Sequence, residues 1–116
     1  MSDVQLLSEK LEELIFWTRF SALPTFRALL MDTLREDVDK LVYELSDGER
    51  STRDIAHMIS EGGKRITHAT VANMWQRWSL LSLVMPAERR GRYRRVVSLE
   101  SLGIEVPPLE RRENDE

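Results

Sequence analysis

Cysteine is absent from this chain of 116 residues, and histidine occurs only as His57 and His68. Without a thiol, the chain has no disulfide, no cysteine nucleophile and no thiolate metal ligand. Two histidines without a third ligand at a suitable spacing make a poor metal site. The glycine-rich phosphate loop and the H-E-x-x-H and G-x-S-x-G motifs are also missing. We therefore expect no metal, no cofactor, no catalytic residue and no enzymatic activity.

Long apolar runs are missing too. No stretch approaches the ~18 consecutive apolar residues that span a bilayer. The opening MSDVQLLSEK has no basic segment followed by an apolar one, as a signal peptide would have. Its acidic character is also unsuited to a membrane surface. We therefore expect a cytoplasmic protein that does not contact membranes. We also expect a single domain, because 116 residues supply one hydrophobic core.

The formal net charge is only −3, but its sign changes along the chain. Residues 1–49 carry −6, residues 50–95 carry +7 and residues 96–116 carry −4. Much of the positive charge lies in RRGRYRR, residues 89–95, which holds five arginines in seven residues. Such a cluster repels itself, so a negatively charged partner is the first candidate for what it contacts.

Apolar residues at the start of the chain follow the period of an α-helix. The spacing is three, four and three residues, and IFWTRF then makes the helix apolar over much of its circumference. Such a helix either packs on its own domain or forms a dimer interface. For the dimer, the candidate residues are Val4, Leu7, Leu11, Leu14 and Trp17. We expect Pro24 to end this helix, because proline disfavours helical geometry in the preceding residue, and a short helix to follow through residues 26–30.

Three further helices are predicted from their capping residues. Thr33 with Glu36 and Ser51 with Asp54 have the spacing of capping boxes, and Thr67 is a candidate N-cap. We expect Asp47-Gly48 to end the first of these helices, with Gly48 as a left-handed cap, and Gly62-Gly63 to end the second. In the third, about residues 67–81, the apolar stripe is Val71, Met74, Trp75 and Trp78.

After these helices, residues 83–85 and 93–99 read as two strands with the arginine-rich loop between them. SLESLG predicts a helical turn that is capped by Ser98 and closed by Gly103. We expect residues 104–116 to form an acidic, disordered tail.

This order of elements, with STRDIAHMI, ITHATVANMWQRW and the hairpin SLVMPAERRGRYRRVVSL, resembles a winged helix-turn-helix domain over residues 36–99. More loosely, the chain is similar to small archaeal transcriptional regulators. The resemblance implies a mostly α fold with a three-helix core and a β-hairpin wing, and it implies DNA binding. Two features depart from the pattern: the turn SEGGKRI is long, and Ser82 stands where such domains often have glycine.

The outward face of helix 67–81 suits the major groove of DNA. Asn and Gln can pair with adenine, Arg can pair with guanine, and a small Ala permits close approach. The free amides of the helix start can meet phosphates. On this face and just before it lie Lys64, Arg65, Thr67, His68, Ala69, Asn73, Gln76 and Arg77. Any solvated helix face is polar, but this helix carries no acid from residue 67 to residue 80.

The arginine loop would then form the wing contact with the minor groove or flanking phosphates. The candidates are Arg89, Arg90, Arg92 and Arg94. Strand alternation places Arg92 and Arg94 on one face of the hairpin and Arg95 on the other. The arginines of this cluster cannot all point the same way, so we expect one of them to pair with an acid in the front half or the tail of the chain.

We therefore expect an N-terminal helical extension over residues 1–34, a winged helix-turn-helix domain over residues 35–103 and a tail beyond. The expected function is binding of double-stranded DNA by a homodimer that regulates transcription. The alternative is a winged-helix module for protein interaction in a larger nucleoprotein assembly. The sequence indicates no small-molecule effector.

Overall fold

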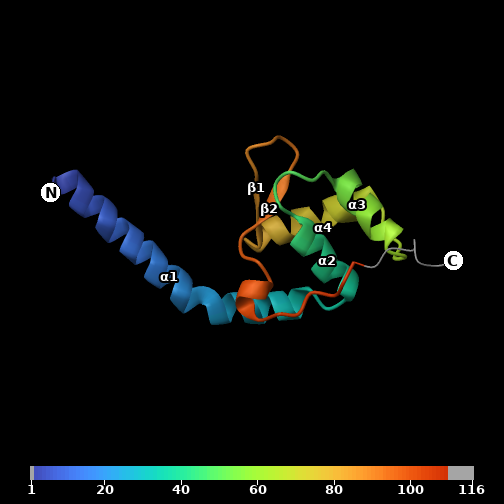
Figure 1. The fold of residues 1–116 in the computed structure, drawn as a ribbon, viewed down its shortest axis with the longest axis horizontal. Helices are drawn as coiled ribbons and strands as arrows, with labels where there is room; N and C mark the ends of the chain where they lie inside the picture. Colours follow the sequence, from blue (N-terminus) through green and yellow to red (C-terminus); the bar gives the residue numbers. More distant parts are fainter. Residues whose placement is uncertain (1, 110–116) are drawn as a thin grey trace.

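The computed structural model describes residues 2–109, apart from the side chain of Arg19. The described residues form four α-helices, two short strands and a 3-10 turn (Figure 1). The elements are α1 Asp3–Thr33, α2 Asp37–Leu45, α3 Thr52–Glu61, α4 His68–Leu80, β1 Val84–Pro86, β2 Tyr93–Arg95 and η1 Glu100–Leu102. The fold is thus mostly helical with a small antiparallel hairpin, as the sequence predicts.

Helix α1 is continuous over 31 residues and contains Pro24. The prediction that the helix ends before this proline was wrong. Proline removes one amide donor and crowds the carbonyl of Phe20 one turn earlier. However, Leu23 and Phe26 on either side of it pack against the core, and this burial opposes a break. The capping box predicted at Thr33 was also wrong, because Thr33 ends α1 and Glu36 is the N-cap of α2.

The two halves of α1 have different surroundings. The first half projects away from the other helices (Figure 1), and its apolar side chains are exposed. In the second half, Leu30 is fully buried, and Leu34 just after the helix is nearly so. Therefore the second half belongs to the core, and the boundary drawn after residue 34 separates residues that pack together.

The core lies between the second half of α1, helices α2 to α4 and the hairpin. Trp75 and Trp78 of α4 are buried in it, as predicted, and Trp78 meets the ring of Tyr43 edge-on at 5.7 Å. The predicted caps of the last two helices are confirmed. Ser51 and Asp54 exchange hydrogen bonds of 3.0 and 2.9 Å at the start of α3, and the Thr67 hydroxyl accepts from the Thr70 amide at the start of α4.

The hairpin pairs Val84 with Arg95 and Pro86 with Tyr93, so its second strand is shorter than the predicted residues 93–99. The other edge of β2 contacts the segment after α2. There the Gly48 amide donates to the Tyr93 carbonyl at 3.0 Å, and Asp47 forms a single bridge with Arg94. Gly48 has the expected positive φ, +86°, but α2 already ends at Leu45. Its conformation thus serves the approach to β2 rather than a helix cap, since a Cβ there would lie 3.1 Å from that of Ala87.

The turn between α4 and β1 contains a non-glycine residue in left-handed geometry. Ser82 has a φ of +61°, a region that L side chains rarely adopt. Ser82 therefore introduces backbone strain at this turn.

The predicted helical turn SLESLG is present as η1. The Ser98 hydroxyl accepts from the Ser101 amide, and Gly103 closes the turn with a φ of +71°. The disordered tail predicted from residue 104 starts too early, because Ile104 is buried and Val106 and Leu109 pack on the core. Residues 110–116 of that prediction lie outside the described residues.

Candidate nucleic-acid interface

Helix α4 presents one buried and one exposed face. Val71, Met74, Trp75 and Trp78 are buried, so a turn of 100° per residue fixes the outward direction of the remaining side chains. The residues predicted to read bases, Asn73, Gln76 and Arg77, are all exposed, and so is the small Ala69 on the same face. Neither α1 nor residues 104–109 covers this face. It offers amide and guanidinium donors and contains no carboxylate.

The start of α4 is open to solvent as well. Thr67 and His68 are exposed, and so is Arg65 in the preceding loop. A capped helix start concentrates partial positive charge and free amides, which is the usual setting for a phosphate oxygen. The cluster of Arg65, Thr67 and His68 is therefore suited to a backbone phosphate.

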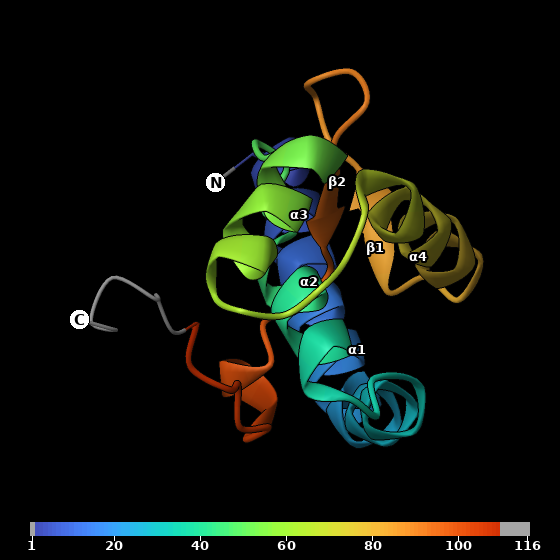
Figure 2. The same cartoon turned by 90° about the vertical axis from the view of Figure 1, so that its right-hand side faces the viewer.

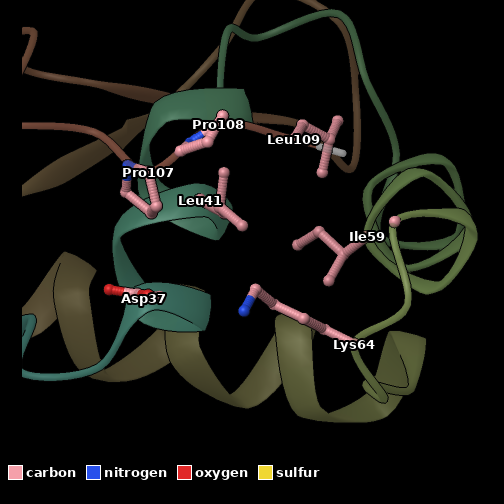
Figure 3. A pocket seen from close by; sticks show the side chains of 8 residues that line it. Asp37, Leu41, Ile59, Lys64, Pro107, Pro108 and Leu109 are labelled. Atoms are coloured by element: carbon pink, nitrogen blue, oxygen red, sulfur yellow. The ribbon is translucent and has the colours of Figure 1, made fainter. Parts of the chain in front are cut away.

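Lys64 has a different environment from its neighbours. Its side chain points into a small cavity of about 170 Å³ between α2, α3 and residues 107–109 (Figure 3). Leu41 and Ile59 supply the apolar wall, and Asp37 lies at one side. Lys64 was predicted to lie with Arg65 just before the outward face of α4, but its side chain enters this cavity, so it is not part of the candidate interface.

The loop between β1 and β2 projects beyond the helices (Figures 1 and 2). Gly91 lies in this loop with a φ of +77°. The Ala87 amide donates to the Arg92 carbonyl at 2.9 Å, which closes the loop at its base. The arginines are therefore carried on a short, hydrogen-bonded extension of the hairpin.

Two of these arginines contact the segment between α2 and α3. The Arg92 side chain donates to the Glu49 carbonyl at 3.1 Å, and Arg89 lies 3.7 Å from the Glu49 carboxylate. The pKa of nearby Asp54 is lowered, chiefly by hydrogen bonds from Ser51 and in smaller part by these two arginines. Sequence reasoning missed Glu49, and its nearest signal was the acidic turn around Asp47.

Arg95 lies on the inner face of the hairpin, as strand alternation predicts. It donates to the Glu44 carbonyl at 2.7 Å and lies 3.8 Å from the Glu44 carboxylate. This contact fulfils the expectation that one arginine pairs with an acid elsewhere in the chain. Arg94 is exposed on the outer face beside Met85. Arg90 is exposed and has no ion pair among residues 2–109.

A second surface beside the hairpin is apolar. There Phe26, Met85 and Val96 help to line an open groove of about 520 Å³. Leu80, at the end of α4, is 85% exposed. It follows Ala69, Asn73 and Gln76 at helical spacing, so it lies on the same outward face of α4 as those residues.

Within residues 2–109, no three side chains of the metal-binding types come together, and no helix is long and apolar enough to cross a membrane. No family model, no curated protein and no solved structure matches this chain.

Proposed function

We propose that this protein is a winged helix-turn-helix protein that binds double-stranded DNA and regulates transcription. The observation that carries the proposal is the uncovered polar face of α4. Asn73, Gln76 and Arg77 are exposed on a helix whose opposite face is fixed in the core. Such a helix is held rigidly, and its outer side chains have the donors and acceptors that read base edges.

The arrangement around α4 supports the same proposal. Helix α3 precedes it, as the first helix of a helix-turn-helix motif does. The hairpin follows it and carries a projecting basic loop (Figure 2). The bridge between Asp47 and Arg94 adds the segment after α2 to the edge of the hairpin, which anchors the base of the wing to the helical core.

In this proposal the contacts have separate roles. Asn73, Gln76 and Arg77 contact base edges in the major groove, while Arg65, Thr67 and His68 contact the phosphate backbone. Arg90 is the leading wing residue, because no acid of the described chain holds it. Arg89 and Arg92 join it after they exchange Glu49 for phosphate oxygens.

The test is fluorescence anisotropy of a labelled random duplex, titrated with the protein over a series of salt concentrations. We expect binding at low salt with a steep negative slope of log K against log salt. The triple variant with Arg89, Arg90 and Arg92 changed to Ala should lose about 0.9 of that slope for each phosphate contact removed.

Arg90→Ala and Arg35→Ala form a matched pair for the same titration. Each removes one exposed guanidinium, but Arg35 lies beyond the end of α1 and pairs with Asp32. We expect Arg90→Ala to weaken binding and Arg35→Ala to leave the slope unchanged. Equal effects of the two would mean that net charge alone, rather than the wing, drives binding.

The alternative function is a winged-helix module that joins a larger assembly through protein contacts. The exposure of Leu80 on the outward face of α4 and the apolar groove beside the hairpin favour this alternative. The same titration separates the two functions. If the wild-type protein does not bind duplex DNA even at low salt, the DNA-binding proposal is wrong and the protein-interaction module remains.

A further inference from the structure

The first half of α1 carries an apolar surface that no described residue covers. Its large apolar side chains are all at least 48% exposed: Val4, Leu6, Leu7, Leu11, Leu14, Ile15, Phe16, Trp17 and Phe20. The three aromatic rings contact one another, with centroids 5.4 to 6.4 Å apart. A single helix of this length is marginal in water unless another surface buries its apolar face. We therefore expect the first half of α1 to pack against a partner.

We infer that the partner is a second copy of this chain, whose α1 runs antiparallel over residues 4–21. The seam follows positions spaced by three, four, three, four and three residues: Val4, Leu7, Leu11, Leu14, Thr18 and Ser21. This spacing reads the same in both directions, so a reversed copy meets the seam at every turn. Leu11 of one copy then packs beside Leu14 of the other at the centre, and a twofold axis relates the two contacts.

Charge favours the antiparallel direction. Residues 3–13 contain four acids, Asp3, Glu9, Glu12 and Glu13, against the single base Lys10. Residues 14–21, the rest of the overlap, contain Arg19 and no acid. A parallel pair would place the two acidic halves side by side. The antiparallel pair places each acidic half beside the less acidic half of the other copy, and it opposes the two helix dipoles.

The length of the uncovered segment fits this overlap. Leu23 is the first residue of α1 that packs on the core. The packed part of each copy, here called its body, therefore begins just after Ser21. In the antiparallel pair, Val4 of one copy therefore reaches the last free turn of the other without meeting its body.

The direction sets the dimensions of the dimer. One molecule is 64 Å long, and an overlap of 18 residues covers about 27 Å. The antiparallel dimer is therefore about 100 Å long, with one body at each end. A parallel pair would place both bodies at the same end and stay near the length of one molecule. The association itself does not depend on DNA binding.

Light scattering and small-angle X-ray scattering of the full chain test the inference. We expect twice the 13.6 kDa of one chain and a maximum dimension of about 100 Å. The variant with Val4, Leu7, Leu11 and Leu14 changed to Ser should return to the mass of one chain. The control Glu9→Ser with Glu13→Ser should keep the doubled mass. Tryptophan fluorescence during unfolding checks that the body of each variant is intact.

The absence of cysteine makes the direction directly measurable. Under oxidation, a mixture of Val4→Cys and Ser21→Cys chains should form a disulfide heterodimer, while Val4→Cys alone should not crosslink. Crosslinking of Val4→Cys alone would establish a parallel pair and overturn the inference. So would a wild type that stays at the mass of one chain at every concentration, or a doubled mass that survives the four serine substitutions.

Discussion

The indole nitrogen of Trp75 donates a buried hydrogen bond of 2.8 Å to the hydroxyl of Ser46. The same hydroxyl donates to the Val42 carbonyl at 2.7 Å, and the Ser46 carbonyl accepts from the amide of Arg95 at 2.8 Å. Ser46 thus connects α2, α4 and the second strand of the hairpin. These contacts fix the position of α4 relative to the hairpin.

Replacing Ser46 with alanine should destabilise the fold by about 1–3 kcal/mol, because the Trp75 indole would lose its partner inside the core. The free energy of unfolding from urea titrations measures this change. Ser60→Ala is the matched control, because Ser60 is exposed and its hydroxyl bond to Ile66 is long, at 3.5 Å. We expect that control to stay within about 0.5 kcal/mol of the wild type. Equal losses in the two variants would contradict a structural role of the buried bond.

Replacing Ser82 with glycine should stabilise the protein. Ser82 has a φ of +61°, and relief of left-handed strain contributes up to about 1 kcal/mol after the entropy cost of glycine is subtracted. Thermal and urea unfolding measure the gain. Ser79→Gly, three residues earlier in helical geometry, should instead destabilise by up to about 1 kcal/mol. Opposite signs for two identical substitutions would identify backbone conformation as the cause.

Alkaline pH should destabilise the fold through Tyr43. Burial raises the pKa of its phenol from 10.0 to about 12, and the hydroxyl contacts the Leu83 and Val97 carbonyls at 3.1 and 3.0 Å. The folded state therefore holds its proton where the unfolded state loses it. The resulting stabilisation is complete below pH 10 and declines as the pH rises toward 12. Urea midpoints across this range should show a shallower decline for Tyr43→Phe, and an identical slope would argue against this assignment.

Glu49→Gln should strengthen DNA binding if the proposed wing contact is correct. The change removes the carboxylate that lies 3.7 Å from Arg89. The Arg89 guanidinium then has no ion pair with Glu49 to break when it contacts a DNA phosphate. We expect a steeper salt slope, by up to about 0.9. Glu100→Gln, an equal charge change at the exposed start of η1, should leave the slope unaltered. An unchanged slope in Glu49→Gln would exclude Arg89 from the contact.

Local signals in the sequence were sufficient for the caps of α3 and α4 and for the presence of α2 and the hairpin, but not for the ends of α2 or the length of β2. The caps at Ser51 and Thr67 depend on residues three positions apart, and the buried stripe of α4 depends on helical period alone. The break predicted at Pro24 failed because the local preference of proline is opposed by the burial of Leu23 and Phe26. That burial depends on where the rest of the chain packs.

The site was predictable to a similar degree. The exposure of Asn73 and Gln76 followed from the buried stripe of the same helix. The contacts of Arg92 with Glu49 and of Arg95 with Glu44 join residues 43 and 51 positions apart. Pairing over such separations is set by tertiary packing, so no spacing in the sequence could assign a particular arginine to a particular acid.

The continuity of α1 has a mechanical consequence. One unbroken helix runs from the exposed aliphatic residues at its start to Leu30 in the core, so no flexible linker separates the two. Helix α1 therefore connects the two ends of the molecule rigidly. One residue inserted between Ser21 and Leu23 would advance the body by about 1.5 Å and rotate it by about 100°. In the inferred dimer, the rotation of one body relative to the other about the helix axis is thus determined by the number of residues in α1 before the core.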